Sequence, residues 1–248
     1  MVLSDDEHEA NFTGWVTIDN GSGKRYVNTS LKLIAGDVHV VKPKRLRGGI
    51  RRKFALRAMA EEAPKPGFSE KSFADYHMYT LGRRVDVNES SQKQIEFIPT
   101  AVDVVVDRYY AFTINVGRTV RQKIDVSSRI KFINEKSNNL GMPLPKGTVR
   151  VFKRDQKDGS LEFIGEDNIN HTPKNENITV QTGNAFDIVA RTKLKSMTKT
   201  RNGYDAVKRL EVHNRGDIDR QFRIELNNYY GDRLQLLQPL KHSLYWHR

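Results

Sequence analysis

The sequence predicts an all-β protein. The expected architecture is an antiparallel β-sandwich, immunoglobulin-like or related, in one unit or two packed units with little helix. Three observations predict it. Apolar and polar residues alternate with a period of two in many short segments, turn-forming residues separate these segments, and no segment longer than about ten residues keeps a helical period. A period of two places one set of side chains on a core face and the other in water.

The first strands are expected within residues 1–41. Gly14–Ile18 reads as a strand that runs into Asp19–Gly23, a turn sequence whose residues tolerate positive φ. Leu31–Ala35 and Val38–Val41 follow as two further strands. We therefore interpret residues 1–41 as the N-terminal strands of a β domain.

A basic stretch rich in Pro and Gly comes next, and we interpret residues 42–72 as a linker or loop with one helical turn at Phe54–Ala60. Its cations are a candidate contact for a polyanion. The alternative, a solvated connector, is favoured, because nucleic-acid-binding modules usually add stacking aromatics or a recognition helix, and Phe54 is the only aromatic residue nearby. Nucleic acid is therefore not an expected partner. The cations are Lys42, Lys44, Arg45, Arg47, Arg51, Arg52 and Lys53.

Residues 73–248 are expected to form the main β-sandwich region. An Asp158-Gly159 pair between two alternating segments predicts a hairpin turn there. The expected strands are Tyr76–Leu81, Gln94–Ile98 and Val102–Val106, together with segments whose core-facing residues are Ile130 and Phe132, Val149 and Val151, Leu161 and Phe163, and Phe222, Ile224 and Leu226.

Composition excludes several classes of function. Apolar residues make up 37% of the chain, below the usual share of about 45–50%, so the core must be economical. Lys and Arg number 42 against 30 Asp and Glu, a net charge of +12. The absence of Cys excludes disulfides, thiolate nucleophiles and Cys-ligated metals.

No phosphate-loop, dinucleotide-binding, zinc-protease or nucleophile-elbow motif occurs, so we expect no enzymatic activity and no cofactor. Neither a membrane span nor a signal peptide is expected.

One polar set remains as a candidate ligand site. Glu166 and Asp167 follow the expected Leu161–Ile164 strand, and His171 comes shortly after them. Carboxylates beside an imidazole can bind a metal or act in acid–base chemistry. The favoured alternative is that the three side chains hold a long exit loop by hydrogen bonds to its own backbone.

The segments Asn139–Asp155, Gly159–Asp167, His171–Pro173 and Gly183–Asp187 resemble the C-terminal domain of unknown function in mucoidy inhibitor A-like bacterial proteins, and weaker similarity extends from about residue 11 to about residue 232. The resemblance implies a β-sandwich-type domain in proteins that are often exported to the periplasm or cell envelope. It implies no catalytic residue, and it leads us to expect a chain truncated at its C-terminus relative to that family.

These observations favour a non-catalytic structural or protein-interaction module of a bacterial cell-envelope protein. Its partner would be an unknown protein or envelope component, and weak self-association through a sheet edge is a further expectation. Two alternatives stay open. One is a carbohydrate- or metal-binding module that uses the loop of Glu166, Asp167 and His171, and the other is a polyanion binder that uses Lys42–Lys53.

The polyanion hypothesis makes a prediction that separates it from the connector. If Lys42–Lys53 is a contact site, binding to heparin falls steeply with salt, because bound cations release counterions, and deletion of the tract abolishes it. The favoured connector hypothesis predicts that deletion leaves heparin binding unchanged at every salt concentration. Titration of both proteins at several salt concentrations decides between them.

Overall fold

The structure, a computed structural model, describes residues 1–36, 67–115, 121–201, 203–216, 219–227 and 233–240. It is 68% strand and 2% helix, and the one helical element in the described residues is a single 3-10 turn, η1 (Lys136–Asn138). The prediction of an all-β, sandwich-like fold is therefore confirmed. Most neighbouring strands are antiparallel; β1 with β12 and β9 with β17 are parallel pairs.

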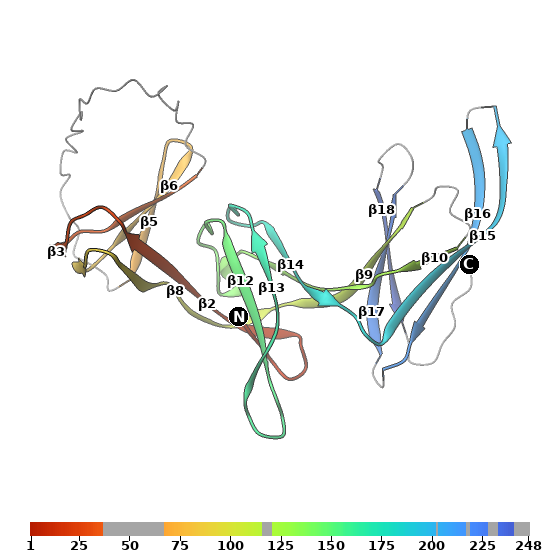
Figure 1. The fold of residues 1–248 in the computed structure, drawn as a ribbon, viewed down its shortest axis with the longest axis horizontal. Coiled ribbons are helices and arrows are strands. Elements are labelled where there is room, and N and C mark those ends of the chain that lie inside the picture. The colour runs from red at the N-terminus through yellow and green to blue at the C-terminus, as the bar shows by residue number, and fades with distance from the viewer. Residues whose placement is uncertain (37–66, 116–120, 202, 217–218, 228–232, 241–248) are drawn as a thin grey trace.

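Two five-stranded sheets form the middle of an elongated molecule (Figure 1). The first, sheet A, contains in spatial order β13 (Leu161–Ile169), β12 (Gly147–Arg154), β1 (Val2–Leu3), β2 (Glu9–Asn20) and β8 (Ser91–Val105). The second, sheet D, contains in spatial order β14 (Asn177–Asn184), β11 (Ser127–Ile133), β9 (Asp107–Asn115), β17 (Arg220–Asn227) and β18 (Arg233–Leu240).

Three smaller sheets lie toward the two ends of the molecule (Figure 1). Sheet E, in the C-terminal lobe, contains β10 (Arg121–Ile124), β15 (Ile188–Thr200) and β16 (Gly203–Asn214). The N-terminal lobe contains a pair, β3 (Tyr26–Thr29) with β7 (Val85–Val87), and a triplet, β4 (Lys32–Ala35), β6 (Tyr76–Leu81) and β5 (Phe68–Phe73).

Within the described ranges, the buried apolar residues gather in three separate cores, as expected for a chain with a low apolar fraction. The central core packs sheet A against β11 and β14, which together form the central lobe, with Ile130 and Val151 fully buried. The C-terminal core packs β9 and β17 against sheet E, with Phe112 stacked on Phe222 at a ring-centroid distance of 5.8 Å. The N-terminal core is small and is centred on Ile95. Sheet D therefore contributes to two sandwiches.

The structure confirms one prediction about core-facing residues and contradicts another. The expected alternation is confirmed at Ile130 and Val151. It is wrong at Leu161 and Phe163, whose side chains are 49% and 54% exposed. The reason is the position of β13, which is the edge strand of sheet A. Its turn end projects below the central lobe in Figure 1, where no described strand forms a second layer over it.

The hairpin turn itself forms as expected. Asp155 and Ser160 close it, with a hydrogen bond of 2.9 Å from the Asp155 N–H to the Ser160 carbonyl. Gly159 has a φ of 75°, which a glycine adopts at little cost. The Asp-Gly pair therefore lies at the end of a four-residue loop rather than in a two-residue turn.

Part of the expected linker is a strand. The last residues assigned to it, 68–72, belong to β5, which pairs with β6. The expected helical turn at Phe54–Ala60 and the expected strand Val38–Val41 lie outside the described residues. β5 is short and mostly polar, so its sequence shows little alternation of apolar and polar residues. The Pro- and Gly-containing composition of the whole stretch therefore predicted a linker instead of a strand.

A buried asparagine holds two loops of the central lobe together. The Asn134 side chain is fully buried, and its amide nitrogen donates to the carbonyls of Met142, at 2.9 Å, and Pro173, at 3.0 Å. Its oxygen accepts from the Gly141 N–H at 3.0 Å. One side chain thus satisfies three backbone groups from segments that enter and leave the β12–β13 hairpin.

We predict that Asn134→Ala lowers the free energy of unfolding by about 3 kcal/mol, because the backbone groups it satisfies stay buried and lose their partner. The control is Asn168→Ala, which removes an exposed hydrogen bond to Thr148 and should cost less than about 1 kcal/mol. Urea unfolding measures both. Equal losses in the two variants would contradict the structural role of Asn134.

Candidate functional site

The three residues of the predicted polar set lie along and just after β13, and they do not converge. Glu166 and Asp167 are strand residues rather than members of an exit loop, because β13 continues to Ile169. Neighbouring strand residues point to opposite faces of a sheet, so their carboxylates diverge. Glu166 pairs with Arg150 on β12 at 3.0 Å, and both side chains are half exposed or more.

Asp167 binds backbone. One oxygen accepts from the Gln181 N–H at 2.9 Å, and the other from the Asn168 N–H at 2.8 Å. Gln181 belongs to β14, the edge strand of sheet D, so this carboxylate joins the two large sheets. Gly165 allows the approach: its φ is 150°, and a Cβ there would lie 2.1 Å from the Thr182 carbonyl oxygen.

His171 also accepts from backbone. The Lys146 N–H donates to its Nδ1 at 3.2 Å, while its Nε2 is buried and has no hydrogen-bond partner among the described residues. Within the described ranges no group of three or more His, Asp or Glu side chains could hold a metal ion. The geometry therefore matches the backbone-holding alternative for Asp167 and His171.

The other predicted site, the basic tract of Lys42, Lys44, Arg45, Arg47, Arg51, Arg52 and Lys53, lies outside the described residues. It stays a prediction.

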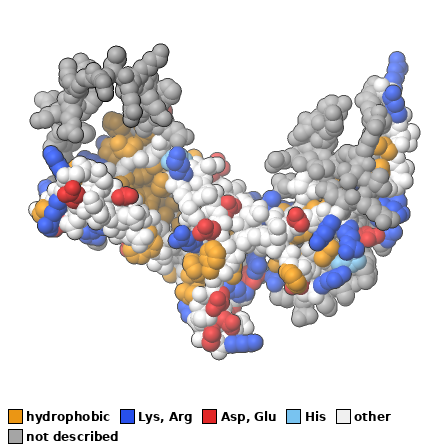
Figure 2. Space-filling view, in the orientation of Figure 1, with side chains coloured by type: hydrophobic (Ala, Val, Ile, Leu, Met, Phe, Trp, Pro, Cys, Tyr) orange, Lys and Arg blue, Asp and Glu red, His pale blue; other side chains and the backbone are white. Residues whose placement is uncertain are grey.

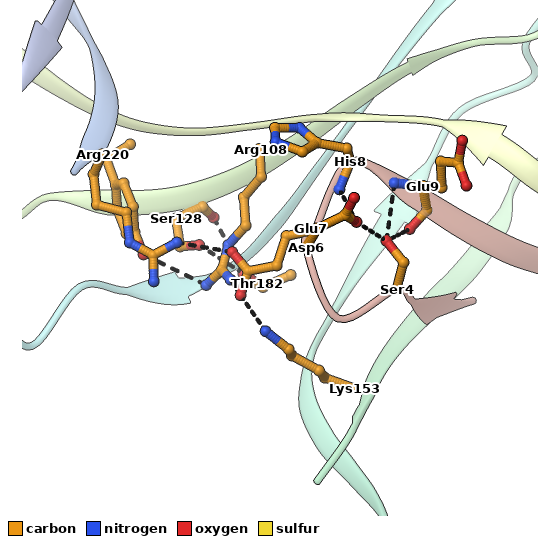
Figure 3. Close-up of polar contacts among 11 residues, drawn as sticks. Ser4, Asp6, Glu7, His8, Glu9, Arg108, Ser128, Lys153, Thr182 and Arg220 are labelled. Carbon is orange, nitrogen blue, oxygen red and sulfur yellow. Dashed lines mark hydrogen bonds and ion pairs between the residues drawn. The ribbon is translucent and has the colours of Figure 1, made fainter. Parts of the chain in front are cut away.

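A third polar cluster centres on Glu7, in the turn between β1 and β2 (Figure 3). The Ser4 hydroxyl donates to Asp6 at 2.6 Å and accepts from the Glu9 N–H at 3.1 Å, which closes the turn. Glu7 has a φ of 65°, in the left-handed region that non-glycine residues rarely adopt. This backbone conformation turns its side chain into the molecule, where it is only 11% exposed.

Three cations from three strands surround the Glu7 carboxylate (Figure 3). Lys153 on β12 lies 2.6 Å away, Arg220 at the start of β17 lies 2.8 Å away, and Arg108 on β9 pairs with the same carboxylate. β12 belongs to sheet A, whereas β9 and β17 belong to sheet D. The Glu7 cluster, by which we mean Glu7, Arg108, Lys153 and Arg220, therefore ties the central lobe to the C-terminal lobe.

The cations set the ionisation of Glu7. Burial alone would raise its pKa, but the hydrogen bond from Lys153 and the charges of Arg108, Arg220 and Lys153 outweigh burial and lower the pKa to about 2. A carboxylate with this pKa stays ionised at neutral pH, so it is a weak general base and cannot act as a general acid. The cluster's chemistry is that of a structural ion pair.

Side chains bind backbone groups at two of the sheet edges, β8 and β14. At the β8 edge, the Val105 N–H donates to Asn138 at 2.7 Å, and Asn139 donates to the Val102 carbonyl at 2.9 Å. At the β14 edge, Asp167 accepts from the Gln181 N–H. Unpaired strand edges template association with other chains, and occupied backbone groups prevent it.

The first half of β13 has no such cover. Since Asp155 bonds to Ser160, the antiparallel alternation leaves the N–H and C=O groups of Leu161 and Phe163 pointing away from β12. Neither residue has an outward backbone partner in the part of the chain that the structure describes. An open groove of about 900 Å³ lies on the other side of Leu161, over β12, β1, β2 and β8, and its mixed polar and apolar lining includes Phe152 and the exposed Trp15.

Comparisons with protein-family models, with curated proteins and with solved structures find no match. The resemblance to mucoidy inhibitor A-like proteins is thus a proposal that rests on the residues alone. Among the described residues, no helix has the length and apolar character needed to cross a membrane.

The residues that the structure singles out were missed by sequence reasoning. Glu7 belongs to an acidic N-terminal run that indicates only the lack of an apolar leader, and its cationic partners lie between 101 and 213 positions further along the chain. No local pattern marks it. The open edge at Leu161 and Phe163 had a usable signal, because both alternate correctly, but periodicity cannot tell which face of a strand is covered.

We predict that Glu7→Gln lowers the free energy of unfolding by about 3 kcal/mol at pH 7, because it leaves three partly buried cations without their carboxylate. The folded-state pKa lies below the ordinary value of 4.5, so this stabilisation is present above about pH 4.5 and disappears as the pH falls toward 2. The variant and the wild type should therefore converge in stability at acid pH.

Urea unfolding between pH 2.5 and pH 7 tests this. Glu166→Gln is the matched control, since it removes an exposed ion pair and should cost less than about 1 kcal/mol. If Glu7→Gln and Glu166→Gln show the same stability and the same pH dependence, the Glu7 cluster does not hold the lobes together.

Proposed function

We propose that the chain is a non-catalytic structural or protein-interaction module in which the β13 edge receives an extended segment of a partner protein as an added strand. The resemblance to the C-terminal domain of mucoidy inhibitor A-like proteins supports a place in the envelope of a bacterium. The observation that carries the proposal is a contrast between edges: side chains bind the backbone at Val102 and Val105 of β8 and at Gln181 of β14, whereas Leu161 and Phe163 have no such partner among the described residues.

The surroundings of this edge fit strand addition. In that mode the main-chain hydrogen bonds supply affinity, and pockets for alternate side chains supply specificity. Leu161 and Phe163, on the edge strand itself, are apolar residues with side chains 49% and 54% exposed. The two side chains lie two residues apart on the same face of β13, and exposed apolar side chains that lie together mark interaction surfaces.

The metal-binding alternative loses support, because Glu166, Asp167 and His171 bind separate partners. The same holds for a carbohydrate site built on these three side chains. Binding of a polyanion through Lys42–Lys53 stays a separate prediction.

A photoreactive amino acid placed at Leu161 of the full chain tests the proposal in the native host. We expect a discrete adduct with another protein. It should persist in Phe163→Ala, which removes only the side chain, and should be lost in Phe163→Pro, which also removes the outward N–H while leaving the ladder to β12 intact. The same probe at Ile34, an exposed apolar residue of β4, should give no such adduct.

Thermal melting first establishes that both Phe163 variants fold. The proposal is wrong if Phe163→Pro keeps the adduct, because the backbone edge is then not used. It is equally wrong if Leu161 and Ile34 give the same adducts or if neither gives one.

A further inference from the structure

The outer face of sheet E carries an excess of positive charge. On β15, Ala190 and Thr192 point into the C-terminal core, so Arg191 and Lys193 between them point outward and are exposed. The register with the neighbouring strands places Lys123 of β10 opposite Arg191, and Arg209 of β16 opposite Lys193. Figure 2 shows Lys and Arg side chains gathered around a His on this part of the C-terminal lobe.

These four cations form a compact surface. Neighbouring strands lie about 5 Å apart, and alternate residues along a strand about 7 Å apart, so all four charges fall within a patch on the order of 10 Å across. One carboxylate lies among them: Glu211 of β16 is opposite Arg191, and it pairs with Arg209 at 3.0 Å. Lys123, Arg191 and Lys193 form no ion pair with a described residue.

This arrangement opposes folding. Like charges directly across an antiparallel pair destabilise it, and the register creates two such pairs, Lys123 with Arg191 and Lys193 with Arg209. The core on the inner face does not require these cations, because outward strand positions accept many polar residues. A surface that keeps repelling charges side by side is suited to an anionic ligand, whose binding relieves the repulsion.

We propose that the outer face of sheet E binds an acidic polysaccharide, a chain of sugars that carry carboxylate or sulfate groups. A flat face with repeated cations suits a polymer with a charge on successive units. Single-stranded nucleic acids are usually held by aromatic side chains that stack on bases, and the four cationic positions have no aromatic residue opposite them in either neighbouring strand. This proposal is independent of the β13 edge.

Polygalacturonate is the probe, and isothermal titration of the full chain at several salt concentrations measures its binding. The test variant is Lys123→Glu with Lys193→Glu, which turns both like-charge pairs into opposite-charge pairs. The matched control is Lys71→Glu with Lys157→Glu, the same change of net charge at exposed positions on β5 and in the β12–β13 turn.

We expect the wild type to bind with an affinity that falls steeply with salt. The test variant should bind at least about tenfold more weakly, with a shallower dependence on salt, whereas the control variant should lose less than about threefold. The melting temperature of the test variant should be unchanged or higher by about 1–3 °C, because the repulsion has been removed. Lost affinity with retained stability separates a binding surface from a structural one.

Three results would overturn the proposal. One is no binding of polygalacturonate by the wild type at low salt, and another is equal losses in the test and control variants. The third is binding of an oligothymidylate, or of vesicles rich in anionic lipid, as tight as that of polygalacturonate and equally weakened in the test variant. If the test variant does not fold, Lys193→Gln alone takes its place, with Lys71→Gln as control.

Discussion

The arrangement of the lobes depends on one buried carboxylate. Glu7 lies in a turn of sheet A and meets Arg108 and Arg220 of sheet D, so the central and C-terminal sandwiches share an ionic joint as well as strands. Desolvated charges attract strongly only in a narrow range of geometries, and a displaced partner leaves a charge unpaired in the interior. Apolar contacts tolerate a displacement of one lobe against the other far better. We infer that the joint contributes orientation between lobes whose separate cores are small.

The backbone strain at Glu7 fits this account. A positive φ for a non-glycine residue costs free energy, and it persists only where the surrounding structure holds it. Ser4 and Asp6 hold the turn from outside, and the three cations hold the side chain from within. The Asp167 carboxylate makes a second bond between the same two large sheets, through the Gln181 N–H. Charge thus contributes at two of the places where the sheets meet.

Polar side chains at the sheet edges also serve two purposes. Asn138, Asn139 and Asp167 bind backbone groups at the edges of β8 and β14, so the same polar side chains that order the loops also oppose strand pairing at these points. The first half of the β13 edge has no such partner among the described residues, and the cationic face of sheet E sets one carboxylate, Glu211, among four cations. Both keep features that folding alone does not favour: open backbone groups in one, and opposed like charges in the other. Functional surfaces are where such local conflicts are expected.

The sequence by itself determined the all-β class, the strands around Ile130 and Val151, and the turn at Asp158-Gly159. These depend on alternation and turn chemistry, which are local properties of the chain. Only the tertiary structure decided that Leu161 and Phe163 face solvent, since that depends on whether a second layer lies above them. It also decided that Glu166, Asp167 and His171 diverge and that Glu7 meets Arg220, 213 residues away. Contacts of that separation are set by packing and register, and no local pattern encodes them.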